Sequence, residues 1–323
     1  MDSPPLLYGN LGSSSINSPP PIPWYEDGNL VLEAGNTRFR ISKGVLAAQS
    51  PVFQEMLSFP QPPDEEAFDG CPVVRLYDSP DDVGYFLKAI YDSSYFEPPP
   101  SPTEISIVAG VLRLSTKYQV DYLRHRAIRH LGTLYPLTLA AFDKRQETRT
   151  TPWKDNTAFF VSLLVRELDL LWVLPSVLYC VCSCPVEDIV QGFLWNGSRM
   201  QMNGGDRAKC LQALLVLANL EHRDILNFLT LSSVEGCSSP GACNTHRLTT
   251  LRSLNTTRDI LNPLDSFDEW EWYLKELCQA CLEVSKRSHF PAREALWESL
   301  PEIFGLPKWL ELDKLRRKAL EKA

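Results

Sequence analysis

Hydrophobic and polar positions alternate most clearly near the start of the chain, in two short runs. Leu30–Ala34 and Thr37–Ile41 are rich in β-favouring residues and flank a Gly-Asn pair, which suits a tight two-residue turn. In the second run two arginines alternate with Phe39 and Ile41, so one face of the strand is expected to be buried and the other wet. The pattern predicts a β-hairpin.

Helical patterns dominate after this hairpin, with one further strand predicted at Val73–Tyr77. Ser50 is a candidate N-cap and Pro51 a favourable first helical residue. Ser101–Glu104 has a capping pattern, in which Ser101 is expected to cap a helix. Val120–Leu131 is expected to form another helix, with its arginines facing outward. Strands grouped early and helices later predict an α+β fold for the first domain.

The second half of the chain is predicted to be largely helical. Ser266–Glu269 has a capping-box pattern, which predicts one helix over Trp270–Ser285. Asn196–Gly205 is expected to be a loop, and Ile303–Trp309 an apolar turn that covers the helical core. No unit of 20–50 residues repeats along the chain, which argues against a repeat array.

Length and composition divide the chain into three parts. With 323 residues the chain exceeds the usual size of one core, so two domains are expected. Residues 1–23, rich in Pro, Ser and Gly, are predicted to be a disordered arm. Residues 24–133 form the predicted first domain, and residues 134–323 the predicted helical second domain.

Charge and hydropathy limit the kinds of partner and the cellular locations that are expected for this chain. The net charge is −8 and the pI is about 5.3, which argues against a general nucleic-acid binder. We find neither a secretory signal nor a stretch apolar enough to span a membrane. An intracellular protein of the cytoplasm or nucleus is therefore expected, with its nine cysteines as thiols or metal ligands.

A group of cysteines in the second half has an unusual arrangement. Cys237 and Cys243 are followed by His246, and Cys278 and Cys281 lie three apart on a predicted helix. Four thiolates, or three with the imidazole, would satisfy tetrahedral zinc. However, the spacing of Cys237 and Cys243 is looser than in zinc knuckles, and free cysteines are common in cores. We expect no metal or cofactor, with structural zinc as the alternative.

The remaining chemistry gives little support for an enzyme. Nucleotide-binding, serine-hydrolase and zinc-protease motifs are missing, and we expect no catalytic residues. His125 and His130 are expected to be solvated, and His289 to lie at a turn. Cys180, Cys182 and Cys184 would share a face on a strand and diverge on a helix, and we favour a packing role for them.

Several motifs between residues 25 and 131 occur in an order known from one family. They are Asp27–Leu32, Phe39–Phe53, Val73–Pro80, Phe86–Tyr91 and Leu112–Tyr118. Together they resemble the BTB/POZ domain, in which a Phe and a basic residue lead into a leucine-bearing helix and Ser-x-x-Phe opens the next. The likeness extends to a large fungal set, in which a helical region follows the BTB domain.

The resemblance implies a small sheet with helical hairpins, and homodimerisation through the first strand and first helices. Asp27 and Lys43 match the charged pair that lines the family's dimer-side pocket, whereas Ser42 stands where many members carry His. The expected function is a protein–protein interaction scaffold that forms homo- or hetero-oligomers. The alternatives are a substrate adaptor of a cullin-type ubiquitin ligase and a metal-dependent transcriptional regulator, which the acidic balance opposes.

Overall fold

The computed structural model describes residues 22–59, 67–257 and 262–321. The chain packs as two compact units, one that extends to Tyr95 and one that starts at Phe96. We call them the sheet unit and the helical unit, and describe each by itself. Nearly all of the predicted disordered arm, residues 1–23, lies outside the described residues.

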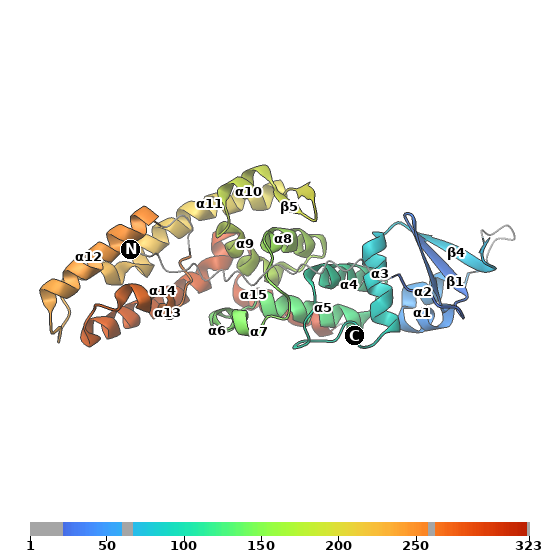
Figure 1. The fold of residues 1–323 in the computed structure, drawn as a ribbon, viewed down its shortest axis with the longest axis horizontal. Helices are drawn as coiled ribbons and strands as arrows, with labels where there is room; N and C mark the ends of the chain where they lie inside the picture. Colours follow the sequence, from blue (N-terminus) through green and yellow to red (C-terminus); the bar gives the residue numbers. More distant parts are fainter. Residues whose placement is uncertain (1–21, 60–66, 258–261, 322–323) are drawn as a thin grey trace. The chain divides into compact units, whose positions relative to one another are not determined.

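The sheet unit contains a four-stranded sheet in the order β2-β1-β4-β3. Its strands are β1 (Leu30–Ala34), β2 (Thr37–Ile41), β3 (Ala67–Phe68) and β4 (Cys71–Leu76), shown in blue in Figure 1. β1 pairs antiparallel with β2 and parallel with β4. The predicted hairpin and the further strand are therefore confirmed.

The hairpin forms for the reasons that the sequence suggests. Gly35 in the turn has φ +54°, a conformation that costs glycine little. Phe39 and Ile41 are buried, while Arg38 and Arg40 are partly exposed. The alternation of side chains along β2 thus separates a core face from a solvated face.

Three helices complete the sheet unit. They are α1 (Lys43–Gln49), α2 (Pro51–Met56) and α3 (Pro80–Tyr91). The Oγ of Ser50 accepts a hydrogen bond of 3.1 Å from the backbone N–H of Phe53, so the predicted N-cap is confirmed.

The helical unit starts with helices that are joined by short connections. They are α4 (Ile105–Lys117), α5 (Asp121–Leu134), α6 (Leu139–Asp143), α7 (Arg145–Thr148), α8 (Thr157–Glu167), the 3₁₀ turn η1 (Leu171–Val173), α9 (Leu174–Cys182) and α10 (Val186–Gln191). A two-stranded hairpin, β5 (Phe193–Trp195) and β6 (Ser198–Met200), then precedes the longest helices.

The rest of the unit is again helical. Its elements are α11 (Gly204–Leu220), the π-helical turn η2 (Glu221–Ile225), the 3₁₀ turn η3 (Asn227–Thr230), α12 (Pro240–Thr257), α13 (Phe267–Leu274), α14 (Gln279–Ile303) and α15 (Trp309–Glu321). The predicted fold class, a sheet-containing N-terminal domain followed by a mostly helical region, is confirmed. Among the described residues, no helix is both long enough and apolar enough to cross a membrane.

Two local predictions in the helical unit are wrong. Asn196–Gly205 was expected to be a loop, but β5 and β6 pair around Asn196 and Gly197, both at positive φ. This Asn-Gly pair is a strong hairpin signal. Ser101 does not cap a helix, because α4 begins only at Ile105; the N–H of Thr103 instead donates to the carbonyl oxygen of Thr150, which holds this stretch extended.

The helix predicted over Trp270–Ser285 is in fact two helices. α13 ends at Leu274, and α14 starts at Gln279 with Cys278 as its N-cap residue. Ser266 precedes α13 but makes no side-chain capping bond. The break changes the position of the cysteines, because Cys278 now lies at a helix start and not inside a helix.

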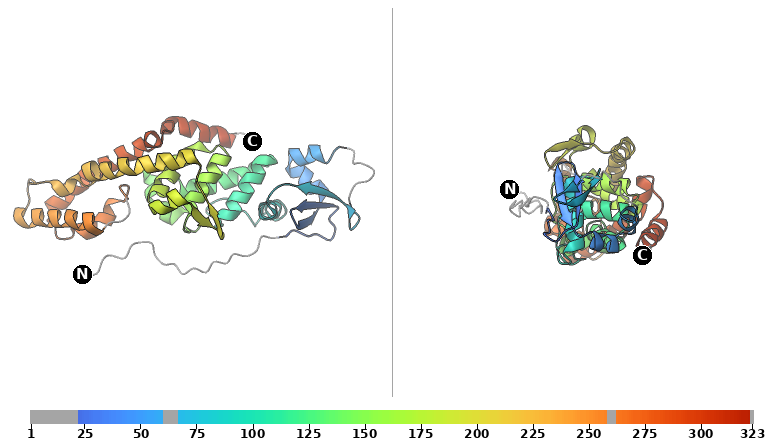
Figure 2. Two further views of the ribbon diagram at one scale, coloured as in Figure 1. Left: turned by 90° about the horizontal axis from the view of Figure 1, so that it is seen from above. Right: turned by 90° about the vertical axis from the view of Figure 1, so that its right-hand side faces the viewer.

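A small separate core holds this part of the helical unit together. We call residues 226–257 and 262–285 the cysteine segment; it includes η3, α12, α13 and the first turns of α14, drawn in yellow and orange in Figures 1 and 2. Its buried cluster consists of Leu226, Phe228, Leu229, Leu254, Phe267, Trp270 and Leu274. Five partly buried residues pack against this cluster: Leu231, Leu251, Tyr273, Leu277 and Leu282.

Candidate functional site

Four apolar residues in α1 and at the start of α2 are exposed to solvent. Gly44, Val45 and Ala48 of α1 are exposed, and the exposed Pro51 at the start of α2 continues this surface. The Val45 side chain is 41% exposed. We call these four residues the α1 face. A surface of small apolar residues without charge is suited to contact another protein.

The backbone around Ser42 is fixed by an aromatic pair. The hydroxyl of Tyr91, at the end of α3, donates a 2.6 Å hydrogen bond to the carbonyl oxygen of Ser42, directly before α1. The ring of Tyr25 stacks on that of Tyr91 with 5.3 Å between their centroids. Burial raises the pKa of Tyr91, so its hydroxyl keeps its proton. These contacts anchor α1 at the position where many family members carry a histidine.

The structure does not bring Asp27 and Lys43 together as an ion pair. Among the described residues no ion pair joins them, and Asp27 is exposed. The backbone N–H of Lys43 instead donates to the side chain of Asn29 over 2.8 Å. The implication that Asp27 and Lys43 line a dimer-side pocket concerns two copies of the chain and stays a prediction.

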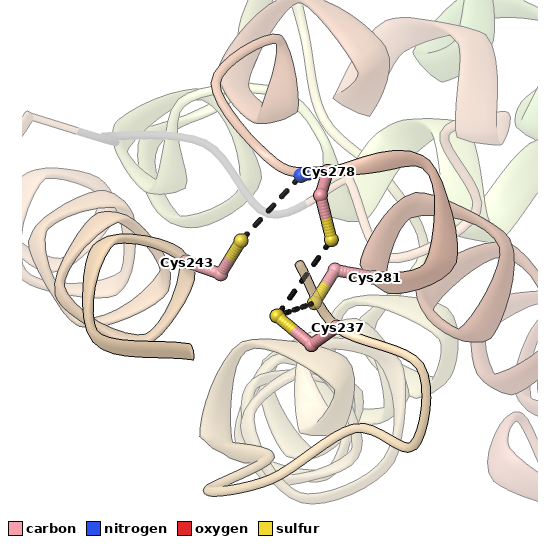
Figure 3. Close-up of side chains that lie close together, drawn as sticks. All are labelled: Cys237, Cys243, Cys278 and Cys281. Atoms are coloured by element: carbon pink, nitrogen blue, oxygen red, sulfur yellow. Dashed lines mark hydrogen bonds between the residues drawn. The ribbon is translucent and has the colours of Figure 1, made fainter. Parts of the chain in front are cut away.

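Four cysteine side chains of the cysteine segment converge on one point. The Sγ atoms of Cys237, Cys243, Cys278 and Cys281 all lie within 4.8 Å of one another. The Sγ of Cys237 is 3.7 Å from that of Cys278 and 3.5 Å from that of Cys281 (Figure 3). The loose spacing of Cys237 and Cys243 along the chain thus does not prevent their sulfurs from meeting.

The four cysteines lie in the loop before α12 and at the starts of α12 and α14. Cys237 follows a turn in which Gly236 has φ +77°, a conformation that favours glycine. Cys243 lies in the first turn of α12. Cys278 is the N-cap residue of α14, and Cys281 lies in the first turn of that helix. Both helices therefore direct the positive end of their dipole towards the sulfurs.

His246 is not part of this cluster. Its Nε2 is 2.8 Å from the carbonyl oxygen of Tyr273, and its Nδ1 is 3.2 Å from the carboxylate of Glu276. Both ring nitrogens are thus engaged away from the sulfurs. Of the two ligand sets that the sequence left open, the geometry favours the four thiolates.

Each of the four sulfurs accepts a hydrogen bond from an N–H group. The backbone N–H of Ser239 donates to Cys237, that of Cys278 donates to Cys243 over 3.5 Å, and those of Cys281 and Ser238 donate to Cys278. These backbone donors lower the pKa of the Cys278 thiol to about 5, whereas burial raises that of Cys281 to about 12. The cluster is therefore expected to carry negative charge at neutral pH.

The fourth sulfur is contacted by a buried arginine. Nη1 of Arg247 lies 3.3 Å from the Sγ of Cys281, and the arginine is only 1% exposed. Its Nε makes no hydrogen bond. Within the part of the chain that the structure describes, no carboxylate forms an ion pair with Arg247. Among the described residues, the sulfur of Cys281 is thus the group that this guanidinium contacts.

The other predicted cysteine group does not converge. Cys180 and Cys182 are buried in α9, and the thiol of Cys182 donates to the carbonyl oxygen of Cys210. The thiol of Cys184 donates back to the carbonyl oxygen of Cys180. Burial raises the pKa of Cys180 to about 11, so this thiol stays protonated. These cysteines pack the helical core.

Two histidines lie elsewhere than the sequence predicted. His130 was expected to be solvated but is fully buried, with ring nitrogens 2.6 Å from the hydroxyl of Thr150 and 2.8 Å from the carbonyl oxygen of Glu97. His289 was expected at a turn but lies inside α14 and is 1% exposed. Burial lowers the pKa of both imidazoles, that of His289 to about 3.

Comparison with known proteins supports the assignment of the first part of the chain. The family model of the BTB/POZ domain matches residues 26–133. This range includes the helices and strands described for the sheet unit, together with α4 and nearly all of α5 of the helical unit. No curated protein and no solved structure matches the chain. Because the motifs, the strands and the family model agree over the same residues, the chain is a BTB/POZ domain-containing protein.

Proposed function

We propose that this chain is a non-enzymatic scaffold that self-associates through the α1 face of its BTB/POZ domain. The BTB/POZ domain is a protein–protein interaction module, and residues 26–133 match it. The observation that carries the narrower proposal is the α1 face, whose Gly44, Val45 and Ala48 are exposed on the first helix. The partner that fits this face is a second copy of the chain, since family members pair through their first helices.

The shape of the face supports a helix-to-helix contact. Small side chains let two helix backbones approach closely, and a twofold axis would place the same patch on both sides of the contact. The outer edge of β2 is less available. The N–H of Tyr25 donates to the carbonyl oxygen of Arg40, and the N–H of Arg40 donates to that of Pro23. The chain's own segment thus occupies this sheet edge.

Light scattering coupled to size-exclusion chromatography tests the proposal on the full chain. At tens of micromolar we expect the mass of a dimer. Val45→Asp or Ala48→Asp would place a charge in the contact and should yield monomers, because an unpaired buried charge is costly. Val190→Asp, on the exposed surface of α10 where Val190 is 48% exposed, is the matched control and should stay dimeric. A monomeric wild-type chain would contradict the proposal.

The other roles are narrower forms of an interaction scaffold. A hetero-oligomer would use the same α1 face, whereas a cullin would dock on the later BTB helices, as the family resemblance implies. Titration of a purified cullin against the Val45→Asp variant separates the two roles, because this variant keeps the later helices intact. All nine cysteines are unpaired thiols in the structure, which supports our proposal of an intracellular, reducing location.

A further inference from the structure

We propose that Cys237, Cys243, Cys278 and Cys281 bind one zinc ion in a closed tetrahedral site, which stabilises the cysteine segment. This inference is independent of self-association, because all four ligands lie in the helical unit and the α1 face lies in the sheet unit. A site with four protein ligands has no open position for a substrate, so its role is structural.

The distances between the sulfurs match one metal ion. A zinc–sulfur bond of about 2.3 Å in a tetrahedron places the sulfurs about 3.8 Å apart. The Sγ atoms of Cys237 and Cys278 are 3.7 Å apart, and those of Cys237 and Cys281 are 3.5 Å apart. No pair among the four exceeds 4.8 Å. A disulfide would need about 2.05 Å between two sulfurs, which is far shorter.

The charges around the cluster are those that a thiolate-bound zinc ion requires. Four thiolates and Zn²⁺ leave an excess of negative charge that must be compensated in a partly buried site. Arg247 supplies a buried guanidinium within 3.3 Å of the Cys281 sulfur, and no carboxylate of the described residues competes for it. A buried arginine without a counter-ion is strongly destabilising, and an anionic metal site would supply that counter-ion.

A shell of N–H donors completes the site. Backbone N–H groups of Ser238, Ser239, Cys278 and Cys281 point at the sulfurs, as described above. The starts of α12 and α14 add the positive ends of two helix dipoles. Groups that contact the ligands in this way orient the thiolates and tune the affinity for metal.

The site would connect parts of the chain that are far apart in sequence. Cys237 and Cys281 are separated by 44 positions, and Cys243 and Cys278 by 35. The ion would fasten the loop before α12 to the starts of α12 and α14. A metal link between these parts would add to the stability that the apolar cluster of this segment provides.

Metal analysis of the full chain, purified without nickel or chelator and with reductant, tests the proposal. We expect about one equivalent of zinc by mass spectrometry of the elements, and less than about a tenth of an equivalent in Cys281→Ser. Cys184→Ser is the matched control, because Cys184 is a half-buried thiol outside the cluster, and it should keep its zinc.

Three results would overturn the inference. They are wild-type protein with reduced thiols and less than about a tenth of an equivalent of zinc, one equivalent of iron in place of zinc, and full zinc content in Cys281→Ser. The metal content of the wild-type chain decides the matter even if Cys281→Ser does not fold.

A second variant tests the role of the buried arginine. Arg247→Met keeps most of the side-chain volume but removes the charge next to Cys281. We expect the zinc affinity, measured by competition with a chromophoric chelator, to fall about ten- to a hundredfold. Arg252→Met, on the exposed side of the same helix, should leave the affinity unchanged. An equal affinity in Arg247→Met and wild type would refute the charge argument.

Discussion

The sheet unit and the cysteine segment differ in the side chains that hold their helices and strands together. In the sheet unit, alternating strands and helix faces bury large side chains such as Leu32, Phe39 and Phe53, each at most 1% exposed. The cysteine segment combines an apolar cluster with four convergent sulfurs and a buried arginine. The comparison teaches that apolar packing defines the first region, whereas on our proposal a coordinated metal ion would add to the apolar packing of the second.

Removal of metal is expected to produce the largest difference in hydrogen exchange between the two regions. We expect a strong zinc chelator to increase hydrogen exchange at the starts of α12 and α14 by at least about a hundredfold, the equivalent of about 3 kcal/mol. β1 and β4 should be unaffected, because their hydrogen bonds and core contain no ligand of the site. Hydrogen exchange followed by mass spectrometry measures both in one experiment.

A variant outside the cysteine cluster serves as the control for this prediction. Cys184→Ser treated with chelator should behave as the wild type does. If α12 and α14 exchange at the same rate with and without chelator, the cysteine segment does not depend on metal, and the contrast between the two regions is lost.

Sequence patterns predicted the sheet unit well because its determinants are local. The turn at Gly35, the alternation along β2 and the cap at Ser50 each depend only on residues a few positions apart in the sequence. The same approach missed the β5–β6 hairpin, although its Asn-Gly pair is a local signal too. It also missed the extended stretch before α4, because Thr103 is held by Thr150, which is distant in the sequence.

The cysteine cluster could be predicted only as a set of candidate residues. The four cysteines were identified, but the pattern Cys237-x5-Cys243 argued against zinc, and no periodicity reveals that the starts of α12 and α14 meet. The break between α13 and α14 is decisive, since it turns Cys278 into an N-cap residue. Arg247 had no signal at all, because a basic residue on a helix is normally solvated.

Low pH should also affect the stability of the two units differently. All five histidines of the chain lie in the helical unit, and burial lowers the pKa of His130 and, to about 3, that of His289. Below pH 6.5 the unfolded chain binds protons at these imidazoles more readily than the native chain does. The free energy of unfolding therefore falls as the pH drops, and His289 alone is expected to contribute about 1.4 kcal/mol per pH unit, or about 2 kcal/mol at pH 5.

Urea unfolding between pH 7.5 and pH 5 measures this effect. Tryptophan fluorescence reports mainly on the helical unit, because seven of the eight tryptophans lie beyond Tyr95. His289→Phe removes one titrating group from a cage formed by Phe228, Phe267 and Trp270 and should have a shallower pH dependence. Subtraction of the two profiles cancels the titration of the cysteine ligands. Parallel profiles would show that His289 does not contribute.

The smallest effect is expected at a helix cap of the sheet unit. Ser50 is fully buried, and its Oγ accepts the N–H of Phe53 at the start of α2, so Ser50→Ala should destabilise the sheet unit by about 1 kcal/mol. Hydrogen exchange of β1 amides measures that loss. Ser266→Ala is the matched control, since Ser266 precedes α13 without a side-chain capping bond and its loss should change little. A larger loss of stability in Ser266→Ala than in Ser50→Ala would mean that local capping matters more in the cysteine segment than in the sheet unit. The proposed contrast between a locally determined region and a metal-dependent one would then have to be abandoned.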